Sequence, residues 1–431
     1  MTQQHWVRGD DSGLDIPATA QALREGGVAF LDRAFRASGA LPADNRVAAI
    51  TQAEDCFGGG TGSKLLLAVQ YEKPQADLPE QLFVKFSRNF DDPLRDRSRH
   101  MMRSEIRFAA LTRTPGFPIR VAQCLFADFN AETGSGLLIT ERVTYGAQGN
   151  EPHYLKCLDY ELPQPLEHYR AIMRALARLS GTHKAGQLHP SFYQRFPYDL
   201  EKSIASEQMR YDADQVMRRV GRTCEFLARY PQLFPENLRD PAFAGRFAAD
   251  VPGFYAREQD IRRLYFSEDD FIALCHWNGN IDNAWFWSGA DGQLECGLLD
   301  WGQVGQMSVA QSIYGAFSGA EPELWDAHLD DIVATFADEF ARCGGPQLDT
   351  EKLRDHMLLV TGWMGVAFLL DYPTLLERRV PDLADVPDYR DPRIRDDEDA
   401  RVPLHMLTMF LNQWQRRDIG ALARRLLDTP Q

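Results

Sequence analysis

The sequence predicts an α+β fold in two lobes, with a small antiparallel sheet in the first third of the chain and a larger, mostly helical lobe after it. Short apolar segments bounded by polar or proline-containing linkers gather before residue 143, which is the pattern of hairpin-connected strands. Beyond residue 144, apolar residues recur mainly at helical spacing. A chain of 431 residues is also too long for one small core.

The expected amino-terminal lobe spans residues 1–143. In its first helix, apolar residues from Ala20 to Phe35 fall near one face. The elements expected here are, in order, a helix over 16–39, strands over 65–71 and 82–86, a helix over about 98–113, and strands around 121–129 and 136–143.

The expected carboxy-terminal lobe spans residues 144–431. A strongly amphipathic helix is predicted over 165–185. Further helices are predicted over 203–229, 239–249, 308–318, 322–342, 350–370 and 402–426. One hairpin interrupts them, with strands over 284–287 and 294–300 joined by an Asp-Gly turn. The acidic, proline-containing stretch 380–402 is expected to be a long surface loop, either a solvated linker or a lid.

Charge and cysteine usage exclude several classes of protein. The formal net charge is −15, and such a surface repels phosphate backbones and anionic lipid, so neither nucleic-acid nor membrane-surface binding is expected. The seven cysteines are scattered and form no CxxC pair, which favours a reducing cytoplasm over a disulfide framework or a zinc site. The polar amino terminus shows no signal peptide, and the apolar stretch 357–370 is shorter than a membrane span and is expected to be a core helix.

A glycine-rich segment precedes the strand over 65–71. It consists of Gly58, Gly59, Gly60, Thr61, Gly62 and Ser63. Clustered glycines let backbone N–H groups approach phosphate oxygens, because no Cβ stands in the way. The segment lacks the GK[ST] ending of a Walker loop, which disfavours a P-loop NTPase. A plain turn is the alternative.

Lys85 lies in the middle of the apolar strand over 82–86, where it must find a counter-charge or reach solvent. A phosphate-binding lysine and an edge-strand lysine both fit this pattern. Glu105, in the next helix, shares a face with Met101 and Phe108. A carboxylate on an apolar face needs a cation, and Lys85 is the obvious candidate; an exposed Glu105 paired with a neighbouring arginine is the alternative.

A polar cluster from Cys275 to Asn283 is followed by the hairpin and then by Asp300, Trp301 and Gly302. Mg²⁺ takes a few hard oxygen ligands from protein and shares the rest with phosphates and water. Asn283 and Asp300 could supply such ligands. Two ordinary turns rich in Asn and Asp are the alternative.

The order of these features is the order of parts in the protein-kinase fold: a glycine-rich hairpin, a strand Lys, a helix Glu, an HxNxxxxN segment, and Asp-Trp-Gly after a short hairpin. The chain resembles the aminoglycoside phosphotransferase and choline-kinase-like superfamily, and is most similar to its ecdysteroid-kinase-like branch, over residues from about 20 to about 420. The most specific stretch runs from His276 to Gly302.

The resemblance implies a protein-kinase-like fold that holds ATP and Mg²⁺. It implies that residues 58–63 cover the ATP phosphates, and that Lys85 contacts the α- and β-phosphates and pairs with Glu105. The backbone from Glu141 to Val143 would be the hinge that reads adenine. His276 would brace the catalytic loop, and Asn283 and Asp300 would bind Mg²⁺.

The chain departs from the family at Asn278, which occupies the position of the usual catalytic Asp, and Trp277 replaces a Gly beside it. An amide cannot accept a proton as a carboxylate does. Four readings remain: Asn278 orients a hydroxyl while another group, with Asp282 nearby, takes the proton; the nucleophile is already an anion; the protein is a nucleotide-binding pseudokinase; or the Asn was introduced to trap a complex.

The resemblance also implies a small-molecule acceptor bound by helices of the carboxy-terminal lobe. The tryptophans at 277, 285, 287, 301 and 363 could line an apolar pocket for a hydrophobic acceptor, although a place in the core is the stronger expectation. The charged run 395–399 could bind a cationic acceptor, but a solvated face is again the stronger expectation. The acceptor and the oligomeric state are not predicted.

Overall fold

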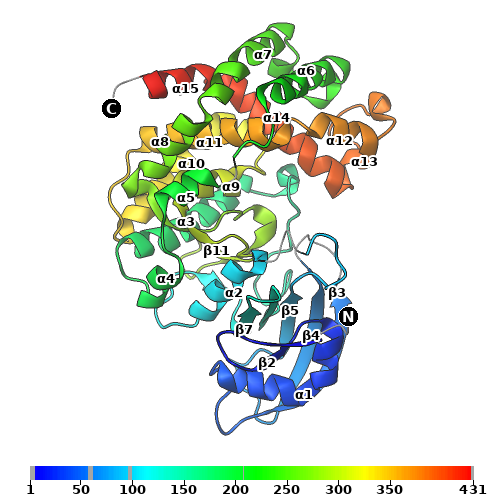
Figure 1. Cartoon of the computed structure of the whole chain (residues 1–431), viewed down its shortest axis with the longest axis vertical. Helices are drawn as coiled ribbons and strands as arrows, with labels where there is room; N and C mark the ends of the chain where they lie inside the picture. Colours follow the sequence, from blue (N-terminus) through cyan, green and yellow to red (C-terminus); the bar gives the residue numbers. More distant parts are fainter. Residues whose placement is uncertain (1–4, 57–61, 96–99, 207, 429–431) are drawn as a thin grey trace.

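The computed structural model describes residues 5–56, 62–95, 100–206 and 208–428, and it has the two-lobed α+β architecture that the sequence predicts. The small lobe is built on a five-stranded antiparallel sheet, and the larger lobe is mostly helical (Figure 1). The elements of residues 1–143 are β1 (Trp6–Arg8), β2 (Asp15–Pro17), α1 (Ala20–Ala37), β3 (Val47–Cys56), β4 (Lys64–Tyr71), β5 (Gln81–Phe86), α2 (Met101–Leu111), β6 (Arg120–Val121), β7 (Cys124–Asn130) and β8 (Ser135–Glu141).

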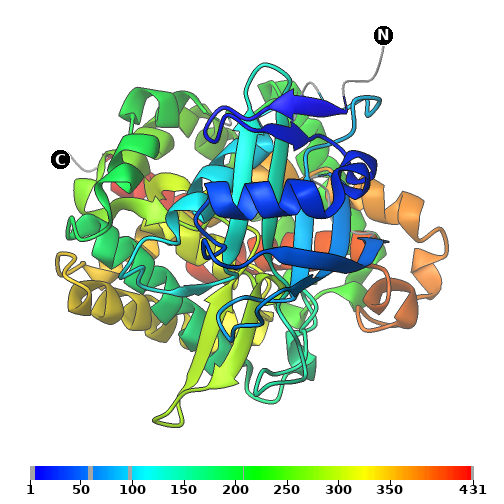
Figure 2. The ribbon, with the colours of Figure 1, turned by 90° about the horizontal axis from the view of Figure 1, so that it is seen from below.

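The five-stranded sheet has the order β3-β4-β5-β8-β7 and separates two helices. Helix α1 crosses its outer face (Figure 2), and the side chains of Leu82, Val84 and Phe86 of β5 pack on that side. Because successive side chains of a strand point to opposite faces, Lys85 must lie on the other face. Helix α2 packs on that face, against β7 and β8. The alternation of β5 therefore directs Lys85 toward the helix that carries Glu105.

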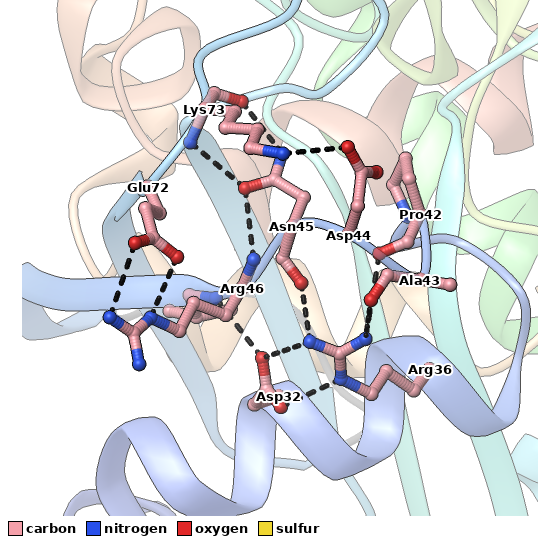
Figure 3. Close-up of polar contacts among 10 residues, drawn as sticks. Asp32, Arg36, Pro42, Ala43, Asp44, Asn45, Arg46, Glu72 and Lys73 are labelled. Carbon is pink, nitrogen blue, oxygen red and sulfur yellow. Dashed lines mark hydrogen bonds and ion pairs between the residues drawn. The ribbon is translucent and has the colours of Figure 1, made fainter.

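A polar network fastens the end of α1 to β3 and β4 (Figure 3). Asn45 is buried, its Nδ2 donates to the Lys73 carbonyl at 2.6 Å, and its Oδ1 accepts from the backbone N–H groups of Arg46 and Lys73, both at 2.9 Å. Arg36 of α1 donates to Asp32 and to the carbonyls of this connection. The buried amide thus satisfies backbone groups that the sheet leaves unpaired.

The helical lobe has its core around α3, which packs against α10, α9 and β11. A hairpin of β10 and β11 extends from it (Figure 2), and β11 also pairs in parallel with β6 of the first lobe. The helices and strands of this part are α3 (Pro165–Lys184), α4 (Pro190–Arg195), α5 (Leu200–Ala205), α6 (Ala213–Arg229), α7 (Pro241–Ala256), α8 (Glu258–Ser267), β9 (Ile272–Cys275), β10 (Ala284–Ser288), β11 (Leu294–Leu298), β12 (Gly305–Ser308), α9 (Val309–Phe317), α10 (Pro322–Arg342), α11 (Thr350–Met364), α12 (Tyr372–Arg379), α13 (Pro392–Arg395), α14 (Glu398–Arg417) and α15 (Ile419–Asp428).

Several predicted helices are interrupted where a local feature stops them. The helix predicted over 203–229 is two helices, and Asp212 begins the second with a capping box. The helix predicted over 402–426 is divided at Asp418, which adopts a left-handed conformation with φ 45°. The helix predicted over 350–370 passes into a π-helical turn (η6, Gly365–Leu369) after Met364.

The prediction of a plain surface loop over 380–402 is wrong. The segment contains a 3-10 turn (η7, Leu383–Asp385), α13 and the first turn of α14. Leu383, Val386 and Ile394 are buried and attach it to the helical core. The acidic residues that suggested a solvated linker lie before, between and after these three anchors.

The expectation of a core helix over 357–370 agrees with the structure, because Met357, Leu359 and Trp363 of α11 are buried. Within the described residues, no single helix is long and apolar enough to cross a membrane; α11 with its π-helical turn and α12 meets that test only as a pair bent by 53°. All seven cysteines are free thiols.

Candidate active site

Lys85 lies at the centre of the candidate site, between two carboxylates. Its Nζ is 2.8 Å from Glu105 Oε2 and 2.8 Å from Asp300 Oδ1. Lys85 and Glu105 are buried, whereas the Asp300 side chain is 48% exposed. The contact between Lys85 and Glu105 that the sequence suggested is present, and the structure adds Asp300 from a point 215 residues further along the chain.

The Lys85 ammonium and the Asp300 carboxylate each favour the charged form of the other. Burial alone would lower the pKa of Lys85, but the carboxylates of Glu105 and Asp300 outweigh burial and raise it. Burial likewise disfavours the ionised form of Asp300, yet the Lys85 ammonium holds the pKa of Asp300 below its ordinary value. At neutral pH the cluster therefore presents a fixed cation beside an ionised, partly exposed carboxylate.

Asp300 is held in an uncommon backbone conformation, with φ 56° in the left-handed region. A non-glycine residue there is strained by roughly 1–3 kcal/mol, and such residues concentrate at functional sites. Its neighbour Trp301 is buried, stacks on Phe108 of α2 with ring centroids 4.1 Å apart, and lies 4.4 Å from the His276 ring. Trp301 thus joins the helix of Glu105 to the segment that contains Asn278.

His276 fastens this segment to the strand that ends at Asp300. Its Nε2–H donates to the Leu299 carbonyl at 2.8 Å, and its Nδ1 accepts from the Asn278 backbone N–H at 2.9 Å. Burial lowers the pKa of His276 to about 4, so the ring is neutral at physiological pH and can fill both roles. On the other side, Gly315 of α9 approaches so closely that a Cβ there would lie 1.9 Å from the Trp277 carbonyl oxygen.

Asn283 is bonded to the residue before Asp300, because the Leu299 N–H donates to the Asn283 carbonyl at 2.8 Å. The Asn283 Nδ2 donates to the Asn278 carbonyl at 2.9 Å. This bond occupies the nitrogen of the Asn283 amide, so the Asn283 Oδ1 is the atom available for a cation. No group of three or more His, Cys, Asp or Glu side chains able to hold a metal occurs among the described residues. A carboxylate and one amide oxygen, completed by phosphates and water, nevertheless suit Mg²⁺.

Asn278 is partly exposed, and its side chain is engaged within the loop. Its Oδ1 accepts from Asn280 Nδ2, while Asn280 is buried and its Oδ1 accepts from Ser318 Oγ at 3.5 Å. The amide at 278 is therefore oriented by a second amide at 280. A carboxylate at 278 would accept the same bond and would keep a second oxygen for another donor.

Asp282 points away from the Lys85 cluster, toward the segment 144–160 and α14. Its carbonyl accepts from His153 Nε2 at 3.1 Å, and its Oδ1 has no hydrogen-bond partner within the described residues. Burial raises the pKa of Asp282, and the Glu398 carboxylate adds to the effect while Lys156 opposes it. Asp282 is thus a half-buried carboxylate with a raised pKa on the helical-lobe side of the loop.

The glycine-rich segment is only partly described, since Gly58, Gly59, Gly60 and Thr61 lie outside the described residues. Gly62 has φ 141°, and a Cβ on it would lie 2.1 Å from the Phe86 carbonyl oxygen, so only glycine fits against the end of β5. Ser63 Oγ is buried with no hydrogen-bond partner among the described residues.

The predicted hinge lies where the chain leaves β8 for the helical lobe. The Glu141 N–H donates to the Gln123 carbonyl at 2.8 Å, and its carboxylate accepts from the Gln123 N–H and from Arg120, both at 3.0 Å. The Glu141 side chain is therefore occupied within the first lobe. Val143 is half-buried and follows the last residue of the strand by two positions.

Sequence reasoning missed Lys64, which pairs directly with Lys85 across β4 and β5. Directly opposed residues of an antiparallel pair place their side chains on the same face. The charges of Lys85, Asp300 and Glu105 all act on its ammonium, and its pKa is lowered by burial and by Lys85. The register of the β4–β5 hairpin places Lys64 opposite Lys85, and the sequence alone does not determine that register.

Most of the tryptophans lie in the core, whereas two residues of the charged run, Glu398 and Asp399, line an open groove. The side chains of Trp285, Trp301 and Trp363 are buried in the core, and none of the five tryptophans lines the groove between α6, α12 and α14 or the cavity between α10 and α14. In the charged run, Asp397 caps α14 and pairs with Arg379, while Arg395 pairs with Glu161.

The chain is similar to solved structures of small-molecule kinases, at low identity. A choline kinase from Cryptosporidium parvum Iowa II is 11% identical, with 88% of this chain and 93% of that chain covered at a TM-score of 0.43. A Plasmodium vivax ethanolamine kinase is 12% identical, with 85% and 83% covered at 0.43. A spectinomycin phosphotransferase with ADP and spectinomycin is 11% identical, with 84% and 94% covered at 0.36. No protein-family model and no curated protein matches the chain.

Proposed function

We propose that the chain is an ATP- and Mg²⁺-dependent phosphotransferase that acts on a small-molecule hydroxyl or anionic acceptor. The observation that supports it best is the position of Lys85, whose Nζ lies 2.8 Å from both Glu105 and Asp300. These three residues come from the sheet, from α2 and from the far end of the β10–β11 hairpin. A buried lysine held by two carboxylates, one of them partly exposed, has the charge to bind phosphate oxygens.

In this proposal each group has a defined task. Lys85 binds phosphate oxygens, and residues 58–63 lie over the phosphates. Asn283 Oδ1 and Asp300 hold Mg²⁺, which neutralises charge on the nucleotide phosphates when it is bound. His276 keeps the loop of Asn278 and Asn283 against the strand of Asp300 through its two hydrogen bonds. The backbone from Glu141 to Val143 contacts the adenine.

Asn278 orients the acceptor in this proposal, and Asp282 is the candidate for taking its proton. General-base assistance typically contributes about 10²–10⁴-fold, so an amide at 278 slows the transfer without removing the contribution of the cation and the lysine. Asp282 is unpartnered at Oδ1 within the described residues and has a raised pKa, because it is half-buried. An acceptor that is already an anion would need neither group as a base.

We place the acceptor on the helical lobe, in an open groove of about 860 Å³ between α6, α12 and the start of α14. Tyr372 and Glu398 line it, and the Glu398 carboxylate acts on Asp282. The groove has mixed charge: Arg219 and Arg222 pair with Asp371, Arg379 pairs with Asp397, and Arg378 also lines it, so an anionic acceptor stays a candidate beside a neutral one. A cytoplasmic location belongs to the same proposal and agrees with the seven free thiols.

The ecdysteroid-kinase-like branch is part of the proposal and rests on residues of this chain, from His276 to Gly302. The similar solved structures include kinases for choline and ethanolamine and a spectinomycin phosphotransferase. The acceptors of those enzymes are small molecules of different chemistry. They therefore suggest a range of compounds to test and do not identify one acceptor.

The decisive experiment is calorimetry of MgATP binding to the wild type and to Asp300→Asn, followed by ADP release with a panel of alcohols and carboxylates. Asparagine tolerates the left-handed backbone of residue 300 better than alanine does, so this variant removes the charge and preserves the conformation. We expect the wild type to bind MgATP and the variant to bind it at least tenfold more weakly. Equal binding by the two proteins would show that the assignment of Asp300 is wrong.

The alternative function is a nucleotide-binding pseudokinase with a sensor or scaffold role, and Asn278 is the observation that favours it. Such a protein binds MgATP but releases no acceptor-dependent ADP. The variant Asn278→Asp tests the point, because a carboxylate there restores the missing base. A rise in ADP release only in Asn278→Asp favours the pseudokinase, whereas release by the wild type favours the phosphotransferase.

A further inference from the structure

A second cavity, of about 190 Å³, lies inside the helical lobe and is separate from the Lys85 cluster. Its walls come from the 157–160 segment, the start of α10, the 388–394 segment and α14. The polar side chains that matter are those of Tyr160, Glu321, Tyr389 and His405. Drug-sized ligands occupy roughly 300–1,000 Å³, so this cavity suits a smaller molecule.

Two buried polar atoms of this wall have no hydrogen-bond partner within the described residues. They are Glu321 Oε1 and the Tyr160 hydroxyl. Glu321 is only 6% exposed, and its other oxygen accepts from the Tyr389 hydroxyl at 3.0 Å. A buried carboxylate oxygen without a donor is costly, and its presence beside a cavity indicates a missing partner.

His405 faces the same carboxylate with a lone pair instead of a proton. Its Nε2–H donates to the Ala320 carbonyl at 3.1 Å, and burial lowers the pKa of His405 to about 4, so the ring is neutral and Nδ1 is an acceptor. Nδ1 lies 3.6 Å from Glu321 Oε1, beyond the length of a hydrogen bond. Two acceptors thus stand side by side, and a donor placed between them can bond to both.

The aromatic walls already accept a cation from the chain itself. The Arg390 guanidinium lies 4.5 Å from the centre of the Tyr160 ring and 5.2 Å from that of Tyr389. Aromatic faces attract cations through the ring quadrupole, and a nearby carboxylate strengthens the attraction. The rest of the wall includes Phe234, Leu233 and Leu404, which suit an alkyl chain.

The arginines of the wall do not turn it into an anion site. Arg401 Nε donates to the Lys156 carbonyl and Arg239 Nε to the Phe234 carbonyl, both at 2.9 Å. Arg239 is exposed at the rim. An anion in the cavity would meet the unpartnered oxygen of Glu321, whereas a cation with N–H donors meets acceptors.

We propose that this cavity binds the primary ammonium group of a small aliphatic amine, which donates to Glu321 Oε1 and His405 Nδ1 while its alkyl chain packs on the apolar wall. The site requires N–H donors, so a quaternary ammonium of similar size should bind poorly. The cavity is lined by none of Lys85, Asn278, Asn283 or Asp300. The inference therefore stands apart from the phosphotransferase proposal and is tested without nucleotide.

The test is calorimetry at pH 8 with n-butylamine, with 1-butanol as its neutral analogue and tetramethylammonium as a cation without donors. We expect saturable binding of n-butylamine only. Glu321→Gln should weaken it at least tenfold, because it removes the charge and preserves the shape. Glu323→Gln is the matched control, since Glu323 is an exposed carboxylate at the rim of the same cavity, and it should change the affinity less than twofold.

The pH dependence supplies a second readout. Burial raises the pKa of Glu321 to about 7, with Glu323 adding to the effect and Tyr389 and Arg390 opposing it; Glu321 in turn acts on the buried Asp159 carboxyl, whose pKa burial also raises. His405 stays neutral above pH 6, and a primary amine stays protonated up to about pH 10. Binding should therefore strengthen by up to about tenfold from pH 6 to pH 8, and it should be flat in Glu321→Gln.

Tyr160→Phe keeps the aromatic ring and removes the unpartnered hydroxyl. It therefore tests whether binding of the amine depends on that hydroxyl. We expect it to bind n-butylamine within about threefold of the wild type. The proposal is overturned if the wild type shows no saturable heat with n-butylamine up to about 10 mM, where even a Kd of about 1 mM would be measurable. It is also overturned if Glu321→Gln, folded by its melting curve, binds as tightly as the wild type, or if tetramethylammonium binds equally well.

Discussion

At the scale of single residues, burying the Lys85 and Glu105 ions costs free energy when the site forms. Two ions taken out of water lose hydration that their attraction recovers only when the geometry is good. Here the lysine meets both oxygens of Glu105, at 3.1 and 2.8 Å, as well as Asp300. Apolar residues would fill the same space without a desolvation penalty, so stability alone does not account for the ions.

Lys85→Met should therefore destabilise the fold by about 3–5 kcal/mol, because it leaves the buried Glu105 without its cation. The double variant Lys85→Met/Glu105→Leu removes both ions and should recover most of that loss. Unfolding in urea measures the free energies of all three proteins. If the single and double variants are equally stable, Glu105 is not held as an uncompensated charge and the pair is weaker than its geometry indicates.

The residues of the site differ in how far the sequence revealed them. The spacing of Lys85, Glu105, Asn283 and Asp300 was sufficient to expect them together, because each stands out against an apolar or turn-forming background. The direction of the Asp282 side chain was open from the sequence, since its neighbour Asn283 is itself a ligand candidate. Glu321 and His405 were missed, because their meeting depends on how α10 packs against α14.

At the scale of elements, the joint between α1, β3 and β4 shows how one amide orders three segments (Figure 3). The connection from α1 to β3 runs through Pro42, Ala43 and Asp44, and its carbonyls receive the Arg36 guanidinium. Asn45 closes the joint by bonding to the backbone of Lys73 at both its N–H and its carbonyl. The outer edge of the sheet, on which β4 and β5 depend for their place, is fixed by this amide.

Asn45→Ala should lower the free energy of unfolding by about 2–4 kcal/mol, because it leaves buried backbone groups of Arg46 and Lys73 unsatisfied. Asp44→Ala is the matched control: Asp44 is exposed and only pairs with the Lys73 ammonium at 2.7 Å, so its loss should be much smaller. Urea unfolding of both variants gives the comparison. A loss of similar size for the two would mean that the charges, and not the buried amide, hold the joint.

Elements with a clear apolar period were predicted, and elements without one were not. Strands β4, β5, β10 and β11 alternate or run apolar and were expected close to where they lie. Strand β3 was missed because it is an edge strand with a mostly solvent-facing surface. Strand β9 has only four residues, all buried, and its partner β12 lies 30 residues further along, so local pattern could not identify the pair.

At the scale of the whole molecule, the predicted division at residue 143 does not coincide with the division of the hydrophobic cores. Phe108 of α2 belongs to the core of the helical lobe, and Leu111, Phe117 and Ile119 pack against it. The sheet and α1 form a core of their own. The first lobe is thus attached through α2, through the pairing of β6 with β11, and through the bidentate pair of Arg195 with Asp11 at 3.0 and 3.1 Å.

Phe108 lies in α2 of the first lobe and packs in the core of the helical lobe, so it connects the two. It stacks on Trp301, next to Asp300, and lies one helical turn after Glu105. Phe108→Ala should destabilise the protein by about 3–5 kcal/mol, and Phe35→Ala, in the separate core of α1 and the sheet, should do so to a similar degree. Only Phe108→Ala should also weaken MgATP binding, because only it removes the support that holds Glu105 and Asp300 on either side of Lys85.

Urea unfolding and calorimetry of the two variants, at a temperature where both remain folded, separate these effects. Two fully buried phenylalanines truncated to alanine lose the same atoms, so a difference in nucleotide affinity between them cannot come from stability alone. We expect at least a tenfold weaker affinity for Phe108→Ala than for Phe35→Ala, since a displacement of about 1 Å in a positioning group costs about that much or more. Equal affinities would mean that the Lys85 cluster keeps its geometry without the stack, and that α2 and the Asp300 strand are positioned independently by their own lobes.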